Sequence, residues 1–283
     1  MPISNKFSLE LNSHSLSHIQ MCEKRYQYEE ISLLRDKREY YPFKRGAGIS
    51  KYLAYWYMAR KKGYVDNKLM DFEFRLMKRM AHDNSFVNIN YGTDDKLHIS
   101  SRLMGYFNKY RNETYKPVAI EKPFTKIIYE DNNVLFAYSG RPDLILDYGQ
   151  FGVGPMDHKS ESRESNIATF NNQFAGYCWA TNARIGMVNY IGLQLDSKDN
   201  KVLRREAFTF TESQLNRWKS DTIEWYFRAM HSIVNKKFLR SWRCEGKYSL
   251  CTYYKLCTSG SRNEERIKIK RDYIKIDKPY QSW

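Results

Sequence analysis

The chain has 283 residues, with 47 Lys and Arg against 32 Asp and Glu, and so carries a formal net charge of +15. Hydrophobic residues make up 42% and aromatic residues 16%, which excludes an intrinsically disordered chain. No apolar run reaches the roughly 18 residues of a membrane helix, and no secretory signal follows Met1, so we expect a cytoplasmic protein, which a phage could also encode. The net positive charge favours a nucleic-acid partner, because counterions are released from the nucleic acid when Lys and Arg neutralise its phosphates.

The first third of the chain has a mainly helical pattern. Apolar and aromatic residues recur at helical spacing over 16–35, with Ser15 placed as an N-cap. A second helix is expected after Gly48, and two more over 68–82 and 96–111.

From about residue 117 the pattern becomes mixed. Short β-branched or aromatic runs separated by turn residues predict strands at 118–120, 125–129, 134–138 and 144–146. The pattern then predicts a helix over 166–180, strands over 186–195 and 202–210, and a long helix from Glu212 to Lys236. No linker or repeat divides the chain. We therefore predict one α/β domain, with a mainly helical part at 1–115 that includes Cys22, a core at 116–240, and a cysteine-containing segment with a basic tail at 241–283.

Two carboxylates and a lysine in the predicted core suggest a metal site. Asp143 precedes one predicted strand, and the tripeptide Asp157-His158-Lys159 begins fourteen residues later. If Asp143 begins one strand and Asp157 ends its neighbour, both carboxylates face one point, where hard oxygen ligands hold Mg²⁺ or Mn²⁺. The two-residue period of a strand puts Asp157 and Lys159 on one face. Such a set supplies what phosphodiester hydrolysis needs, namely an activated water and positive charge for the transition state.

Three motifs in this order resemble the PD-(D/E)XK nucleases, and within them the RecB-like branch that includes AddB-type and CRISPR-associated exonucleases. Arg141-Pro142-Asp143 looks like the G-x-x-D strand of that branch, Asp157-His158-Lys159 like its acidic-x-Lys strand, and the segment from Gln173 to Tyr177 like its Q-x-x-x-Y helix. The resemblance spans most of the chain. It implies a restriction-endonuclease-like central mixed sheet flanked by helices, and a metal-dependent DNA nuclease.

The resemblance also assigns roles to residues. Asp143 and Asp157 would bind Mg²⁺ or Mn²⁺, with the carbonyl of His158 as a further ligand, and Lys159 would assist the water and the transition state. The DNA partner would be single-stranded or carry free ends, as for an exonuclease. The same core serves sequence-specific endonucleases, and a catalytically inactive DNA-binding or scaffold subunit is the alternative from another class.

Three further residues belong to this comparison. Gln173 and Tyr177 are four apart, so on a helix they face the same side, either toward a phosphate or into the core. Glu121 stands where related nucleases have an upstream acidic residue that supports the metal site. The family often has a metal-binding histidine after a glycine in the early helix, whereas here Gly48 leads to Lys51, and a protonated lysine binds no metal. Lys51 therefore either leaves more water on the metal or contacts phosphate.

The cysteines resemble those of the iron-sulfur subset of the branch. The opening from Ser15 through Cys22 to Tyr26 looks like its S-x(6)-C-x-x-x-Y start, and three cysteines follow near the C-terminus. The resemblance implies a [4Fe-4S] cluster on four thiolates, which are Cys22, Cys244, Cys251 and Cys257. A structural Zn²⁺ on the same thiolates and unligated cysteines are the alternatives. Cys178 would be a small buried thiol.

Two features of the sequence stay outside this assignment. His14 and His18 are four apart on a predicted helix, and we expect them to be exposed to solvent rather than to form a metal pair. DNA repair, recombination, CRISPR adaptation and phage DNA metabolism all fit the motifs, as does a protein partner in such a complex.

Overall fold

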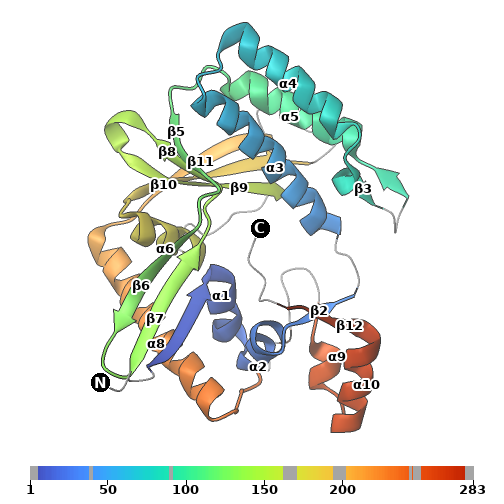
Figure 1. Ribbon diagram of the computed structural model, residues 1–283, viewed down its shortest axis with the longest axis vertical. Coiled ribbons are helices and arrows are strands. Elements are labelled where there is room, and N and C mark those ends of the chain that lie inside the picture. Colours follow the sequence, from blue (N-terminus) through green and yellow to red (C-terminus); the bar gives the residue numbers. More distant parts are fainter. Residues whose placement is uncertain are drawn as a thin grey trace. The chain divides into compact units, whose positions relative to one another are not determined.

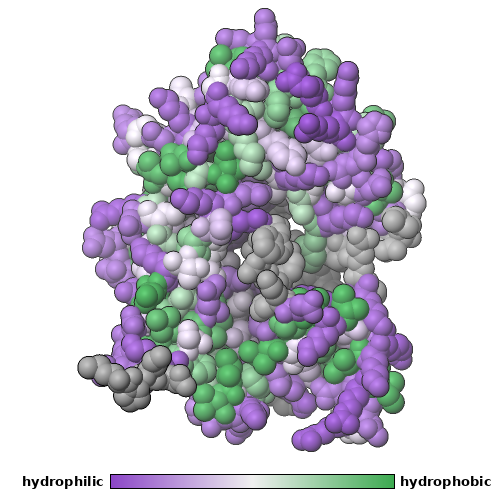
Figure 2. Space-filling model, viewed as in Figure 1, coloured by the Kyte–Doolittle hydropathy of each residue, from purple (hydrophilic) through white to green (hydrophobic). Residues whose placement is uncertain are grey.

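A computed structural model describes residues 6–37, 41–88, 92–161, 171–193, 202–241, 244 and 250–277. The chain forms two compact units (Figure 1). The first unit comprises Met1–Glu39, Thr125–Gly140 and Asn216–Trp283, and the second comprises Tyr40–Phe124 and Arg141–Leu215. Within the described ranges, no helix has the length and apolar character needed to cross a membrane. Hydrophilic side chains cover most of the face shown in Figure 2, as the high charge content requires.

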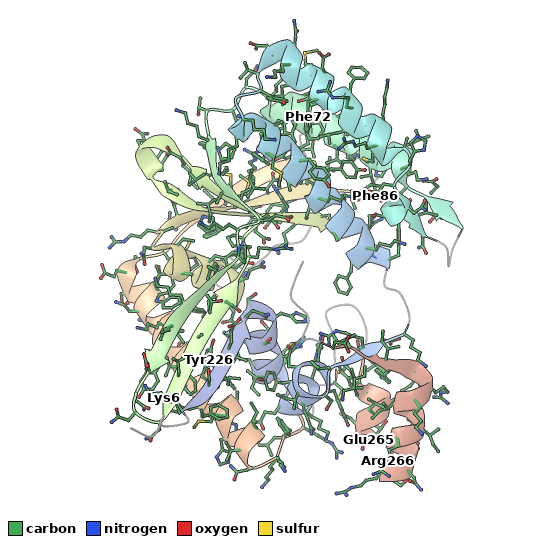
Figure 3. All side chains as sticks on the ribbon, viewed as in Figure 1. Lys6, Phe72, Phe86, Tyr226, Glu265 and Arg266 are labelled. Carbon is green, nitrogen blue, oxygen red and sulfur yellow. The ribbon has the colours of Figure 1, made fainter. Side chains whose placement is uncertain are left out.

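The first unit is built on a three-stranded sheet in the order β1-β7-β6. These strands are β1 (Phe7–Asn12), β6 (Phe124–Glu130) and β7 (Val134–Gly140), and β1 runs parallel to β7. The long helix α8 (Glu212–Val234) covers the sheet through Tyr226 (Figure 3). The Tyr226 ring stacks on Phe136 at 5.1 Å, and its hydroxyl lies within hydrogen-bonding distance of the Leu11 and Ala137 carbonyls. A buried hydroxyl needs such partners, so these bonds fix where α8 packs.

The predicted helix over 16–35 is broken in the structure. The helix α1 (Ser13–Met21) begins one residue after Asn12, whose side chain accepts hydrogen bonds from two backbone amides, so that Asn12 and not Ser15 is the N-cap. Cys22 has extended backbone angles and ends the helix. The chain continues as α2 (Glu23–Tyr26), a π-helix η1 (Gln27–Ile31), and the strand β2 (Leu34–Asp36). The remaining elements of this unit are α9 (Tyr254–Cys257), α10 (Arg262–Asp272) and β12 (Tyr273–Lys275), which pairs with β2.

The second unit contains a five-stranded sheet in the order β11-β10-β9-β8-β5. Its strands are β5 (Lys116–Ile120), β8 (Leu144–Asp147), β9 (Val153–Glu161), β10 (Ile185–Gly192) and β11 (Leu203–Thr209). Only β9 and β10 are parallel, and the other neighbours are antiparallel. The predicted mixed sheet is therefore confirmed.

Helices flank this sheet on both faces (Figure 1). The helices are α3 (Tyr41–Lys61), α4 (Asp66–Met80), α5 (Lys96–Tyr110) and α6 (Asn172–Thr181), with short elements at η2 (Asn84–Phe86), β3 (Val87–Asn88), β4 (Thr93–Asp94) and η3 (Gly149–Phe151). On one face, Trp56 of α3 stacks on Phe107 of α5 at 5.2 Å, in a core that includes Met156 of β9. On the other face, Phe174 of α6 stacks on Phe208 of β11 at 4.8 Å. The result is a mixed α/β fold.

The predicted strands divide between two sheets. The runs at 118–120 and 144–146 become β5 and β8 of the five-stranded sheet, whereas those at 125–129 and 134–138 become β6 and β7 of the other unit. Asp157 lies in the middle of β9 and not at the end of a strand, because pairing with β10 continues to Glu161. The first part of the helix predicted over 166–180 lies outside the described residues, and α6 begins at Asn172.

Candidate active site

The helix α6 is positioned by its own N-cap. The side chain of Asn171 accepts hydrogen bonds from the backbone amides of Gln173 and Phe174 at 2.9 and 3.0 Å. Asn is a favourable N-cap residue, because its short side chain can accept hydrogen bonds from the amides of the first turn, which have no partner within the helix. The cap puts Gln173 in the first turn and Tyr177 one turn later, on the side that packs against β9.

Three side chains from β9 and α6 form a closed set of contacts. The Lys159 ammonium lies 2.5 Å from Oδ2 of Asp157, which confirms that these two residues share a face of the strand. Gln173 donates from Nε2 to Oδ1 of Asp157 at 2.8 Å and accepts from Lys159 at Oε1 at 2.9 Å. The amide therefore orients the acid and the ammonium at the same time.

Asp143 joins this set through the backbone of β9. It directly precedes β8, and its Oδ2 accepts a hydrogen bond from the His158 amide at 2.6 Å. Burial raises the pKa of Asp143 to about 6, although the His158 amide and Lys159 act in the opposite direction. Burial also raises the pKa of Asp157, and the neighbouring Asp143 adds to the increase. The two carboxyls thus lie close enough for each charge to disfavour the other.

The donor set fits a hard divalent cation. Asp157 is only 5% exposed, and its Oδ2 is ion-paired with the Lys159 ammonium. Burial raises the pKa of both Asp143 and Asp157, and a bound cation would stabilise the charged form of each carboxylate. Carboxylate oxygens are the ligands that Mg²⁺ and Mn²⁺ prefer. Asp143 and Asp157 are therefore suited to hold such an ion.

The segment before β8 is held by Tyr177 and Glu121. The Tyr177 hydroxyl donates to the Arg141 carbonyl at 3.2 Å, and the guanidinium of Arg141 lies 3.7 Å from the Glu121 carboxylate. The Glu121 amide donates to the Asp143 carbonyl at 2.9 Å, from a residue whose φ of +45° is uncommon for a side chain of this kind. The structure thus brings Glu121 and Tyr177 to the backbone around Asp143, whereas their side chains lie against Arg141.

The ring of His158 lies on the opposite face of the sheet from Asp157. Its Nδ1 is 2.7 Å from the side-chain amide of Asn189, and it stacks on Tyr57 of α3 at 6.0 Å. Burial lowers the pKa of His158 to about 3, which keeps the imidazole neutral. A metal role for His158 is thus left to its backbone carbonyl, which stays a prediction.

Asn189 and Arg205 are two residues that the sequence analysis missed. Arg205 donates to the Asn189 side chain at 3.2 Å and pairs with the buried carboxylate of Glu113. It also donates to the hydroxyls of Tyr57 and Tyr106 at 2.8 and 2.7 Å. Asn189 is a polar residue within the apolar strand β10, which was a signal in the sequence, whereas Arg205 stands among other charged residues of β11 and gave none. Through Asn189, this network contacts His158 of β9 on the face of the sheet opposite to Asp157.

Lys51 is turned toward Asp83. The two charged groups are 3.1 Å apart, and the Tyr52 hydroxyl also donates to Asp83 at 3.1 Å. Burial raises the pKa of Asp83, but hydrogen bonds from Ser85 and Lys51 outweigh it and hold the pKa at about 2. Arg79 and His82 line the same groove as Lys51 and Asp83, and the role of Lys51 stays a prediction.

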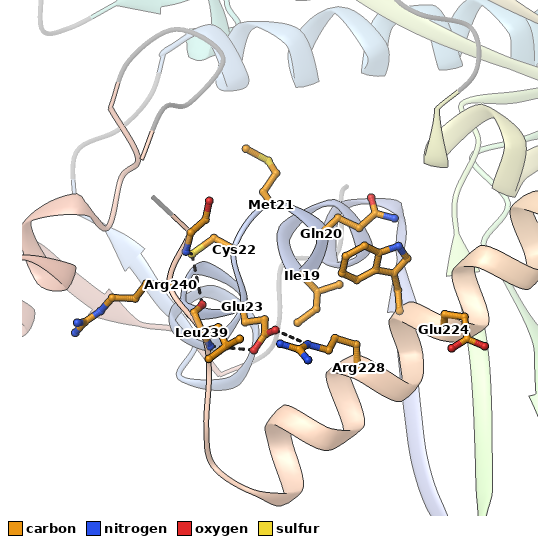
Figure 4. A pocket seen from close by; sticks show the side chains of 11 residues that line it. Ile19, Gln20, Met21, Cys22, Glu23, Glu224, Arg228, Leu239 and Arg240 are labelled. Atoms are coloured by element: carbon orange, nitrogen blue, oxygen red, sulfur yellow. Dashed lines mark hydrogen bonds and ion pairs between the residues drawn. The ribbon is translucent and has the colours of Figure 1, made fainter. Parts of the chain in front are cut away.

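The four predicted cluster ligands lie in the first unit. Cys22 follows α1, and its thiol lies 3.9 Å from the Leu239 carbonyl and accepts from the Ser241 amide at 3.4 Å (Figure 4). Cys244 donates to the carbonyl of the same Ser241 at 3.8 Å. The Cys251 amide in turn donates to the Cys244 carbonyl at 2.8 Å. Three of the cysteines are thus linked through neighbouring backbone.

These thiols do not form the compact cysteine cluster that the sequence suggests. In the described ranges, no three cysteine sulfurs lie within 4.8 Å of one another, because the thiols of Cys22 and Cys244 use backbone partners instead. Burial raises the pKa of Cys257 to about 11, and nearby Cys22 and Cys251 add to the increase. Cys178 lies in the second unit, where it is fully buried as expected, and burial raises its pKa to about 12.

The histidine pair contradicts the expectation of solvent exposure. His14 is partly exposed, but the side chain of His18 is only 3% exposed and lies beside the carboxylates of Glu29 and Glu30. The sequence pattern missed this burial because it depends on the break at Cys22, which lets η1 fold back on α1.

The chain was compared with known proteins. No protein-family model and no curated protein matches it. Among solved structures, it is similar to a protein of Eubacterium rectale named "Putative exonuclease", with 10% sequence identity and a TM-score of 0.45 over 83% of this chain and 86% of that one. It is also similar to SSO0001, with 16% identity and a TM-score of 0.29 over 46% of this chain, and it spans 58% of the length of SSO0001. Identities this low transfer no activity, so the function is inferred from the site.

Proposed function

We propose that the protein is a metal-dependent deoxyribonuclease that hydrolyses phosphodiester bonds at the site formed by β8, β9 and α6. The observation that carries the proposal is the joined set of Asp143, Asp157, Lys159 and Gln173, in which two acids with raised pKa values lie beside an oriented ammonium. Perturbed carboxyls next to a specific charge partner are typical of catalytic sites. The order of the motifs in the sequence supports the same function.

Each residue of the candidate site has a separate role in this proposal. Asp143 and Asp157 would hold Mg²⁺ or Mn²⁺, with the His158 carbonyl as a third oxygen. The bound cation supplies positive charge and lowers the pKa of a bound water. Lys159 orients the attacking water and neutralises charge on the phosphate as the transition state forms. Gln173 fixes the positions of Lys159 and Asp157, since its side-chain amide forms a hydrogen bond with each.

The substrate that we propose is single-stranded DNA or a free DNA end, as the RecB-like resemblance implies. The net charge of +15 supports a nucleic-acid substrate through counterion release. Glu121 and Tyr177 act as positioning residues, because both contact the Arg141 to Asp143 segment. Repair, recombination, CRISPR adaptation and phage DNA metabolism are the settings in which such a nuclease would act, alone or with protein partners.

The test is degradation of end-labelled single- and double-stranded DNA with Mg²⁺ or Mn²⁺, run with Lys159→Ala and with Lys116→Ala as a matched control. Lys116 is an exposed lysine at the start of β5. Metal-dependent cleavage that Lys159→Ala lowers at least about 100-fold, while DNA binding persists, supports the proposal. DNA binding without cleavage by the wild-type protein would instead favour an inactive DNA-binding or scaffold subunit.

We also propose that Cys22, Cys244, Cys251 and Cys257 bind a [4Fe-4S] cluster in the first unit. Four thiolates are the ligand set of such a cluster. A tetrahedral zinc ion with bonds of about 2.3 Å holds its sulfurs about 3.8 Å apart, closer than any three of these sulfurs lie in the described ranges. A cluster of four irons spans a wider gap. Iron and sulfide analysis of anaerobically purified protein tests this, and zinc without sulfide would contradict it.

A further inference from the structure

Two helical segments of the first unit bring two histidines and two glutamates together. His14 and His18 lie one turn apart on α1, and Glu29 and Glu30 are consecutive residues of the π-helix η1. One ligand atom from each residue lies within 4.8 Å of all the others. Both glutamates contact the same imidazole, that of His18. The group shares no residue with the carboxylates of β9 or with the four cysteines.

The spacing of these atoms is that of a tetrahedral metal site. Nε2 of His14 lies 3.3 Å from Oε1 of Glu29, whereas Nδ1 of His18 lies 3.3 Å from Oε2 of the same carboxylate and 3.5 Å from Oε1 of Glu30. Zn²⁺ binds imidazole nitrogen and carboxylate oxygen at about 2.0–2.2 Å, which puts neighbouring ligands of a tetrahedron about 3.4 Å apart. The distances to Glu29 and Glu30 are close to this value, and since one ligand atom from each of the four residues lies within 4.8 Å of the others, small side-chain shifts would complete the tetrahedron.

Two atoms of the group lack the hydrogen bonds that buried polar atoms require. The side chains of His18 and Glu30 are 3% and 6% exposed. These two atoms, Nδ1 of His18 and Oε1 of Glu30, lie 3.5 Å apart, and among the described residues neither has a well-aligned hydrogen bond. Such atoms cost free energy unless something satisfies them, and one cation would satisfy both.

Neighbouring arginines contact one of the four residues, and another of the four is open to solvent. Arg25 and Arg35 lie 3.5 and 3.4 Å from the Glu29 carboxylate, so Glu29 keeps charged partners of the kind that orient ligating carboxylates. The side chain of His14 is 37% exposed, which gives an ion access from solvent.

From this geometry we infer that His14, His18, Glu29 and Glu30 bind a divalent transition-metal ion, with Zn²⁺ as the best fit. The ion would join α1 to η1 across the extended residue Cys22. Its place in the fold makes it a structural ion, since all four ligand positions are filled by side chains.

The experiment uses Co²⁺ as a spectroscopic probe on the full chain after removal of metals with a chelator. We expect Co²⁺ to give visible d–d bands that depend on His14 and Glu30, whereas a thiolate-to-cobalt charge-transfer band would report ions on the cysteines instead. Zn²⁺ should displace the probe. His14→Ala and Glu30→Gln should each weaken binding at least about 100-fold, since each removes a direct ligand. His231→Ala, an exposed histidine of α8, should bind as the wild type does.

His14→Ala and Glu30→Gln are chosen because they spare the fold. His14 is partly exposed and Gln has the shape of Glu, whereas the buried His18 is a poorer choice. Circular dichroism checks that both variants are folded. Failure of the wild type to bind Co²⁺, or d–d bands that stay unchanged in both variants, would each overturn the inference.

Discussion

Gln173 donates a hydrogen bond to Asp157 at 2.8 Å while it accepts one from Lys159 at 2.9 Å. The side-chain amide of Gln173 therefore fixes the positions of both the Asp157 carboxylate and the Lys159 ammonium. Gln173→Glu replaces the donor with a carboxylate facing Asp157, and we expect it to lower cleavage at least about tenfold through charge repulsion. Gln173→Leu removes both bonds and should lower kcat more than KM, since it disturbs groups that act in the transition state.

The matched control for these variants is Gln214→Leu. Gln214 bonds to Thr211 at the start of α8, away from β9 in the sequence, and its loss should leave cleavage unchanged. Equal cleavage by the wild type and by both Gln173 variants would show that this amide has no part in the reaction.

The raised pKa of Asp143 predicts proton release on metal binding. With a pKa of about 6, raised chiefly by burial, Asp143 is increasingly protonated below that pH in the metal-free protein. A cation must then displace the proton, so affinity for Mn²⁺ should fall by up to about tenfold for each pH unit below 6. Calorimetry in buffers of different ionisation enthalpy, between about pH 5 and pH 7, measures the released protons. Asp143→Asn should abolish this pH-dependent part, and a wild-type affinity that stays constant over the range would contradict the prediction.

Gly154 on β9 leaves no room for a side chain. A Cβ at this position would lie 2.0 Å from the backbone carbonyl oxygen of Ile185, which cannot move without displacing β10. We expect Gly154→Ala to lower the free energy of unfolding by about 3 kcal/mol, the upper end of overpacking costs. Urea unfolding measures the change. Gly260→Ala is the control, because the nearest atom to its Cβ is a flexible carboxylate oxygen at 3.5 Å, and a loss of similar size there would refute the steric explanation.

The pair of Asp83 and Lys51 predicts a pH dependence of stability. Asp83 has a folded-state pKa of about 2, below its usual 3.8, so its charged form stabilises the folded state. This contribution is complete above about pH 4 and is lost as the pH falls through about 2. Asp83→Asn keeps the shape and the cap on Ser85 but removes the charge, and should cost about 1 kcal/mol at neutral pH. Acid titration of both proteins should show this difference vanish, and a difference that persists at pH 2 would rule out the charge as its source.

The sequence alone was enough to place site residues that lie on one element. Asp157 and Lys159 share a face because side chains alternate along a strand, and Gln173 and Tyr177 lie on one side of α6 because they are one helical turn apart. Both relationships depend only on local geometry. The catalytic roles given to these residues remain predictions.

Relationships between elements were decided by the tertiary structure. The contact of Asp143 with the His158 amide requires β8 to pair with β9, and the sequence does not specify which of four similar runs enter this sheet. The runs that became β6 and β7 are short β-branched or aromatic runs like those of β5 and β8, yet they join a sheet with β1 in the other unit. The burial of His18 likewise depends on the extended backbone at Cys22. Such choices rest on packing between residues far apart in the chain, because the pattern of one strand or helix is compatible with several partners.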